Sequence, residues 1–171
     1  MSRSLRAVAA AAIGTLVLAA PAIAAAPPRK VGTSINVKNA SIGQLKLGQS
    51  AAKARSLLGR ADNQNSTGFS GRSSSLSLSY KRYGLNLIFW RGTQGGSPKL
   101  ATIVVSSTQY KANGVGIGSS VTSLQGALGR NLQCYTKGRG IKQPFCQYVR
   151  RSGDITFDLR GTRVSSIRIG S

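Results

Sequence analysis

One short motif occurs twice in this chain, 70 residues apart. Its two copies are Leu47-Gly48-Gln49-Ser50 with Leu58-Gly59-Arg60, and Ile117-Gly118-Ser119-Ser120 with Leu128-Gly129-Arg130. Between the two parts of each copy, apolar residues recur with the i, i+3, i+6, i+7 spacing of one face of a helix. A serine stands where the first N–H groups need an acceptor, and a glycine follows the last turn. We therefore expect two short helices, at Ser50–Leu58 and Ser120–Leu128.

Segments with the alternation of half-buried strands follow each helix. They are Leu76–Tyr80, Leu85–Trp90 and Leu100–Val105, and then Phe145–Arg150, Ile155–Leu159 and Val164–Ile169. The polar stretch from Asp62 to Ser75 is interpreted as a loop. Because a short helix must bury its apolar stripe, the neighbouring sheet is the nearest place for it. The expected fold class is α+β, with two tandem units, 40–107 and 110–171, each a short helical segment packed on an antiparallel β-sheet.

The N-terminal residues 1–24 have the pattern of a secretory signal peptide. Arg3 and Arg6 precede an apolar run, and Ala22-Ile23-Ala24 offers a cleavage site. The alternative is a transmembrane anchor, but the run is shorter than the roughly 20 residues that a span needs. We expect a chain without a transmembrane span, secreted to the extracellular space or the cell envelope. Residues 25–39 are expected to be a leader or linker.

Charge is the most unusual feature of the composition. Lys and Arg number 24 against three acids, which gives a formal charge of +21. Removal of a signal containing Arg3 and Arg6 would lower this charge by 2, to +19. Such a chain attracts anions in general: an acidic protein, an anionic wall polymer, anionic lipid or nucleic acid. Nucleic acid is the least favoured of these, since no RNA-binding signature is present.

Composition argues against most catalytic schemes. The chain has no His and no Glu, so Ser-His-Asp and Cys-His arrangements are impossible. A pair of catalytic carboxylates would have to include Asp154 with Asp158 or Asp62. We favour the alternative that Asp154 and Asp158 pair with Arg150 or Arg160. The Gly-rich run 114–120 is interpreted as a structural turn rather than a phosphate site. We expect no enzyme activity, no cofactor and no metal.

Cys134 and Cys146 are the only cysteines. They do not form a Cys-x-x-Cys pair, and no His is present to complete a zinc site. In an exported chain, a single structural disulfide between them is the expected state.

The candidate binding residues surround the single tryptophan. They are Trp90, Tyr83, Arg82, Arg91 and Ile88, which are close in sequence. Trp, Tyr and Arg dominate the binding energy of protein interfaces, so these residues are candidates for one contact surface at an edge of the sheet. The alternative is that Trp90 caps the core between the two units.

The repeated motif resembles two known families. A Gly-x-Ser turn, a helix ending in Leu-Gly and an antiparallel sheet ending in a basic-Val-x-x-Ile strand resemble the outer-membrane lipoproteins of the β-barrel assembly machinery. Two such units in one secreted chain with a short-span disulfide resemble the β-lactamase inhibitory proteins. The matching positions are Gly48, Ser50, Leu58, Gly59, Gly118, Ser120, Leu128, Gly129, Cys134 and Cys146. The chain departs from the lipoproteins because no lipobox cysteine is present, and it is more basic than the inhibitors.

These observations lead to two functional hypotheses. The first is a secreted, strongly basic, non-enzymatic binding module, monomeric, that binds or inhibits an acidic protein. The second is a cell-envelope protein that binds an anionic wall polymer or lipid through charge. A salt titration of binding distinguishes the two hypotheses, because binding through charge weakens with salt whereas binding through apolar anchors does not.

Overall fold

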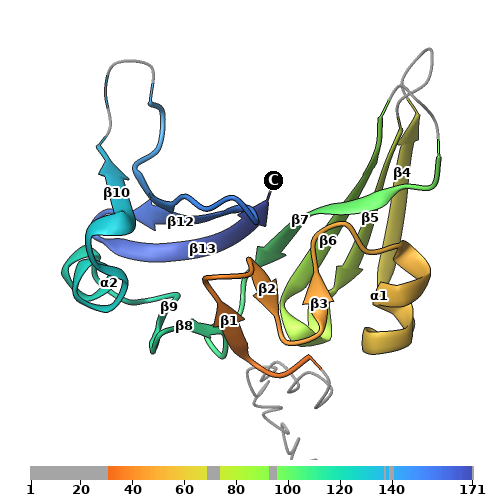
Figure 1. Cartoon of the computed structure of the whole chain (residues 1–171), viewed down its shortest axis with the longest axis horizontal. Coiled ribbons are helices and arrows are strands. Elements are labelled where there is room, and N and C mark those ends of the chain that lie inside the picture. The colour runs from red at the N-terminus through yellow and green to blue at the C-terminus, as the bar shows by residue number, and fades with distance from the viewer. Residues whose placement is uncertain (1–30, 69–73, 93–95, 137, 139–140, 171) are drawn as a thin grey trace, which may run out of the picture.

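The structure is a computed structural model that describes residues 31–68, 74–92, 96–136, 138 and 141–170. Within these residues the chain forms an eight-stranded sheet, a five-stranded sheet, two α-helices and two single-turn 3-10 helices (Figure 1). The signal peptide expected at residues 1–24 lies outside the described part. None of the helices described is long and apolar enough to cross a membrane.

The eight-stranded sheet is the largest element and joins both halves of the chain. Its strands lie in the order β10-β11-β12-β13-β7-β6-β5-β4, and every neighbouring pair is antiparallel. Their bounds are β4 Asn63–Gly68, β5 Ser74–Tyr80, β6 Leu85–Arg91, β7 Lys99–Val105, β10 Leu132–Tyr135, β11 Phe145–Tyr148, β12 Asp154–Arg160 and β13 Arg163–Gly170. The two halves meet where β13 pairs with β7, with Ile167 opposite Val105.

The five-stranded sheet is built from very short strands in the order β3-β2-β1-β8-β9. Their bounds are β1 Ser34–Asn36, β2 Ser41–Ile42, β3 Leu45–Lys46, β8 Lys111–Ala112 and β9 Val115–Gly116. β1 and β8 pair in parallel, which brings residues 34–35 against residues 111–112. Ile35 is only 2% exposed, so residues 31–39, which we had assigned to a leader, belong to the packed fold.

The two α-helices, α1 (Ala51–Leu58) and α2 (Val121–Leu128), have the same caps, as the motif predicts. The Ser50 hydroxyl accepts from the Lys53 N–H at 3.2 Å, and the Ser120 hydroxyl accepts from the Ser123 N–H at 3.1 Å. The preceding glycines are bonded to the sheet in equivalent ways. The Gly48 N–H donates to the Leu100 carbonyl, and the Gly118 N–H donates to the Val164 carbonyl. The motif therefore fixes where each helix begins against a strand.

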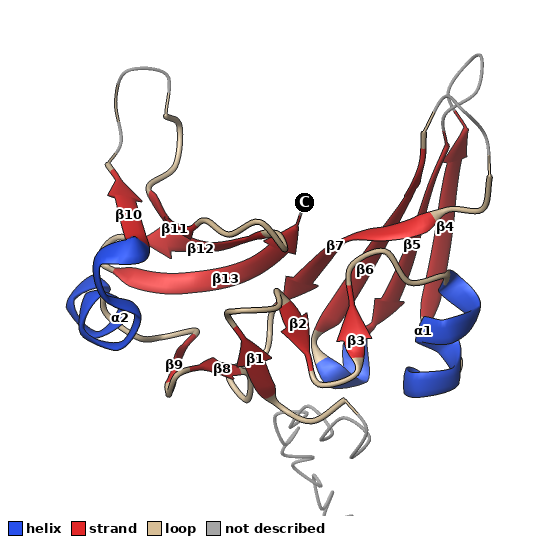
Figure 2. Cartoon of the chain, in the orientation of Figure 1, coloured by secondary structure: helices blue, strands red, loops and turns tan. Residues whose placement is uncertain are grey.

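One face of the eight-stranded sheet carries the core. On β6, Leu85, Leu87 and Phe89 are buried, whereas the alternate residues Asn86 and Ile88 are only half-buried. β12 shows the same alternation, with residues 155, 157 and 159 buried. In Figure 2, α2, β9 and β8 lie below β13, and the buried side chains of α2 and of the two sheets join a single cluster.

The expected fold class is wrong. The described chain is mostly β-structure with two large sheets, and it is not a helix-on-sheet α+β unit repeated twice. Each α-helix has only eight residues, and residues 62–75, interpreted as a loop, supply strand β4 and the first residues of β5. The physical reason is that backbone pairing needs no apolar alternation at a sheet edge, where both faces can be exposed.

Candidate functional site: the open face of the sheet

The face of the eight-stranded sheet opposite the core, here called the open face, is the candidate functional surface. Its side chains alternate with the buried ones along each strand, because successive strand residues point to opposite faces. By register it comprises Gln133, Tyr135, Phe145, Gln147, Asp154, Thr156, Asp158, Ser166, Arg168, Thr102, Val104, Asn86, Ile88, Trp90, Lys99, Ser75, Ser77, Ser79, Asn63, Asn65 and Thr67.

Aromatic side chains lie on this face at two separate places. Trp90, on β6, is 44% exposed, so it does not cap the core. Tyr135 on β10 is 36% exposed and stacks on Phe145 of β11, with ring centroids 4.8 Å apart. Five strand-to-strand steps separate β10 from β6, which corresponds to about 24 Å across the sheet at the usual strand spacing. Along the strands, Tyr135 is level with the start of β6, whereas Trp90 lies near its end. The open face therefore offers two aromatic anchors with a polar surface between them.

The Tyr135–Phe145 stack lies beside the disulfide. Cys134 and Cys146 are bonded, as expected, and are opposite each other in the β10–β11 ladder. Since Cys146 is buried, its neighbour Phe145 must point to the other face of the sheet. The stack was not predicted from the sequence, although the alternation around the two cysteines places Tyr135 and Phe145 on the same face of the sheet.

The central charged group of the open face is an ion pair. The Arg168 guanidinium donates from Nη2 to Asp158 Oδ1 at 2.6 Å and from Nε to Asp158 Oδ2 at 3.0 Å, and the Ser166 hydroxyl donates to Oδ2 at 2.7 Å. The hydrogen bond with Asp158 raises the pKa of Arg168. The partner of Asp158 is thus Arg168, not Arg150 or Arg160.

Asp154 also has partners within the sheet. Its carboxylate accepts from Gln147 Nε2 at 2.8 Å and from the Arg150 backbone N–H at 3.4 Å. These bonds hold the carboxylate in place between β11 and β12. Among the residues that the structure describes, no group of three or more His, Cys, Asp or Glu could hold a metal ion.

Of the five predicted binding residues, the structure places Trp90 and Ile88 on the open face. Tyr83 and Arg82 lie in the single-turn 3-10 helix η1 (Lys81–Tyr83), before the start of β6. The strand between them and Trp90 spans about 20 Å. Alternation puts Arg91 with the core-facing residues, and its Nε is buried. Nearness in sequence along an extended strand does not bring these side chains together.

Arg82 binds the end of α1, and Tyr83 packs against the Arg82 guanidinium. Arg82 Nη2 donates to the carbonyl oxygens of Leu58 at 3.3 Å and Arg60 at 2.6 Å. The Arg82 backbone N–H donates to Asp62, and the guanidinium lies over the Tyr83 ring at 4.9 Å. These contacts satisfy carbonyl groups at the end of a helix, as cationic side chains often do.

Positive charge is concentrated away from the open face. Two of the three acids, Asp154 and Asp158, lie on the open face near Arg168. Exposed cations of the helices, the five-stranded sheet and the turns include Lys38, Lys46, Lys53, Arg55, Arg60, Lys81, Arg82, Arg130, Lys142, Arg150 and Arg151. Arg160 and Arg163 are exposed at the ends of β12 and β13, and Lys99 and Arg168 are the exposed cations of the open face. The long-range field therefore arises from other surfaces, while the centre of the open face is close to neutral.

The Gly-rich run before α2 uses its N–H groups inside the protein. The Gly116 N–H donates to the Ser119 hydroxyl at 3.1 Å, and the Ser119 N–H donates to the Gly116 carbonyl at 3.0 Å. The Val121 N–H donates to the Thr162 carbonyl at 3.1 Å. Since these donors have partners, the structural interpretation of residues 114–120 holds.

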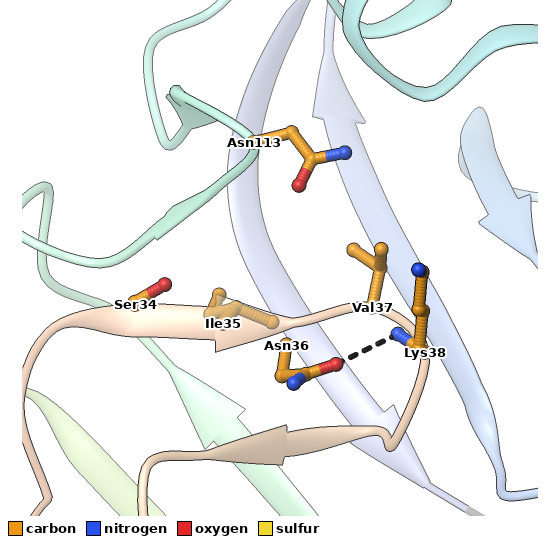
Figure 3. Close-up of a pocket in the computed structure, with 6 residues that line it drawn as sticks. All are labelled: Ser34, Ile35, Asn36, Val37, Lys38 and Asn113. Carbon is orange, nitrogen blue, oxygen red and sulfur yellow. Dashed lines mark hydrogen bonds between the residues drawn. The ribbon is translucent and has the colours of Figure 1, made fainter.

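The described part of the chain also has a shallow pocket beside the five-stranded sheet, of about 350 Å³ (Figure 3). It lies between β1 with the following turn and the β8–β9 turn at Asn113. The Asn36 side-chain oxygen in this pocket accepts from the backbone N–H groups of Lys38 at 3.0 Å and Asn39 at 3.1 Å. Its side-chain oxygen is thus used to close the turn, and the lining has no acid.

Comparison with protein-family models, with curated proteins and with solved structures finds no match for this chain.

Proposed function

We propose that this chain is a secreted, non-enzymatic binding module that holds another protein on its open face. The observation that carries the proposal is the spacing of the two exposed aromatic anchors, Trp90 and the Tyr135–Phe145 stack, on one sheet face. Exposed aromatic side chains are the residues that dominate interface energies, and two anchors on one face, at least about 24 Å apart, fit an interface of standard size.

The partner is an acidic protein, and the protein inhibits it if the covered surface includes an active site. The exposed cations outside the open face draw such a partner in from a distance, whereas the nearly neutral open face makes the close contacts. The Cys134–Cys146 disulfide is compatible with an oxidising, extracellular location.

The test begins with a pull-down of secreted proteins, followed by affinity measurements on the isolated partner. Trp90→Ala and Tyr135→Ala should each weaken binding mainly by faster dissociation. Lys53→Ala, on the exposed side of α1, is the matched control and should only slow association. If the two aromatic variants bind as the unmodified protein does, the open face is not the contact surface.

A second function is favoured by the exposed cations of the helices and the five-stranded sheet. These cations could bind an anionic wall polymer or anionic lipid and leave the open face uncovered. Retention on purified cell wall or on vesicles containing phosphatidylglycerol, released completely by salt and unaffected by Trp90→Ala, would support this function over the first.

A further inference from the structure

Strand β4 forms one edge of the eight-stranded sheet, and among the described strands it pairs with β5 alone. All six of its residues, Asn63-Gln64-Asn65-Ser66-Thr67-Gly68, are exposed. A strand at a sheet edge uses half of its backbone N–H and C=O groups in the ladder, and the other half point outward. β4 therefore presents a row of outward-facing backbone donors and acceptors.

The usual devices that protect a sheet edge are absent from β4. It has no charged side chain and no proline, and its six residue pairs with β5 run from Asn63–Ser79 to Gly68–Ser74 without a register shift. By contrast, the β6–β7 and β12–β13 ladders both contain shifts. Natural sheets usually block such an edge with lysine, proline or a bulge, because an unprotected edge pairs with other chains.

The other edges described are less suited to pairing. β10, at the opposite end of the eight-stranded sheet, has four residues and is tied to β11 by the disulfide. The edge strands of the five-stranded sheet, β3 and β9, have two residues each. Among the described strands, β4 is thus the edge that can accept a long partner strand.

Charges beside β4 indicate what kind of strand it accepts. Arg55 of α1 donates from Nη2 to the Gln64 side-chain oxygen at 2.7 Å, and Arg60 is exposed shortly before the strand. Asp62, the acid directly before β4, accepts from the backbone N–H of a third arginine, Arg82, at 3.3 Å, so positive charge is in excess at this end of the strand. A second copy of this chain, with a formal charge of +21, would be repelled. An extended segment with acidic side chains would be attracted by the same arginines.

We infer that β4 accepts an extended, acidic segment of a partner protein as a ninth strand of the sheet. Main-chain hydrogen bonds would supply the affinity, and the cations near Asn63 would favour acidic side chains. The added strand would also widen the open face next to Asn63, Asn65 and Thr67. This site does not depend on the proposed function, because it lies at the sheet edge and uses neither aromatic anchor.

The test uses nitrogen-15-labelled protein and two synthetic peptides, Thr-Glu-Val-Glu-Val-Glu-Thr and its charge-reversed form Thr-Lys-Val-Lys-Val-Lys-Thr. Amide hydrogen exchange is measured with each peptide. The acidic peptide should slow exchange by at least about tenfold at every second residue of Asn63–Gly68, which is the signature of strand pairing. Absence of this protection, or equal protection by both peptides, would overturn the inference. The same protection in concentrated protein without peptide would assign the edge to a second copy instead.

Two neighbouring variants, Asn65→Pro and Ser66→Pro, separate loss of pairing from loss of folding. Adjacent strand residues direct their N–H groups to opposite sides, so one proline removes an outward donor and the other a ladder bond to β5. The variant that keeps the original melting temperature should no longer bind the acidic peptide. If that variant still binds the acidic peptide, the peptide does not bind at the edge of β4. Titrating the Trp90→Ala protein with the acidic peptide distinguishes the two proposals. If this variant no longer bound the peptide, the peptide would bind on the open face and not at the edge of β4.

Discussion

Arg168 of β13 reaches diagonally across the ladder to Asp158 of β12, with Nη2 2.6 Å from Oδ1. Beside this pair, β13 bonds to β7, so the bridge lies near the junction of the two halves of the sheet. The arginine side chain is 51% exposed and the aspartate 15%. The pair thus neutralises a carboxylate at the centre of the open face, beside the uncharged Val104 and Thr102 of β7.

A double-mutant cycle with Asp158→Asn and Arg168→Gln measures this bridge. We expect a coupling free energy of about 0.5–1 kcal/mol, because one partner is half-exposed and screened by water. Chemical denaturation of the two single variants and the double variant provides the measurement. A coupling indistinguishable from zero would mean that the two side chains do not stabilise each other in solution.

The two serine caps should contribute equally. Ser50→Ala and Ser120→Ala each remove a hydroxyl that accepts a helix N–H at 3.1–3.2 Å, so each should lower the free energy of unfolding by about 1 kcal/mol. Ser56→Ala is the control, since Ser56 is exposed inside α1 and accepts no such bond in the structure. Urea denaturation would contradict the equivalence of the caps if one variant lost stability and the other did not.

Substitution of two glycines by alanine should change the stability of the protein in opposite directions. At Gly116 an added Cβ would collide with the Tyr110 carbonyl oxygen, so Gly116→Ala should cost about 2 kcal/mol or more. At Gly126, inside α2, a Cβ meets nothing within 4 Å, and Gly126→Ala should stabilise the protein by about 0.5–1 kcal/mol. Melting temperatures that move in the same direction for both variants would disagree with the packing described.

Tyr110 gives a prediction for alkaline pH. Its ring is fully buried and its hydroxyl has no hydrogen-bond partner among the described residues. Burial raises the pKa of Tyr110 well above the ordinary value of 10.0. Above about pH 10 the unfolded chain therefore loses this proton while the folded chain keeps it, and stability falls as pH rises.

Tyr110→Phe should remove this alkaline loss and, at neutral pH, raise the free energy of unfolding by about 1 kcal/mol. At neutral pH, Tyr80→Phe is the matched control, because the Tyr80 hydroxyl donates to the Gly59 carbonyl at 3.3 Å and its loss should be neutral or destabilising. Burial also raises the pKa of Tyr80, so this variant should remove its own share of the alkaline loss. Urea denaturation at about pH 7 and pH 10.5 compares the variants. A destabilised Tyr110→Phe protein would show that the hydroxyl has a partner after all.

Local features of the fold could be predicted from the sequence, and non-local ones could not. The helix at Ala51–Leu58 is encoded by its own caps and apolar stripe. The parallel pairing of Ile35 with Ala112 joins residues far apart in sequence, and neither segment is long enough to show a strand period. β4 was missed because an edge strand exposed on both faces has no apolar alternation to recognise.

The candidate site was predicted only in part, for a similar reason. The alternation along β6 correctly separates Ile88 and Trp90 from the buried side chains. Sequence proximity, however, grouped Trp90 with Arg82, which lies beyond the other end of the strand. The second anchor, Tyr135 on Phe145, forms across two strands and depends on the register of the disulfide-linked hairpin.

The central claim is that the open face binds a protein through aromatic anchors rather than through charge. The most direct measurement is the affinity of the isolated partner for Trp90→Ala and Lys53→Ala proteins over a range of salt concentrations. We predict that Trp90→Ala loses about 2 kcal/mol, roughly thirtyfold in Kd, whereas Lys53→Ala mainly lowers the association rate and its salt dependence. Equal small losses for the two variants, with complete release at about 0.5 M salt, would contradict the claim.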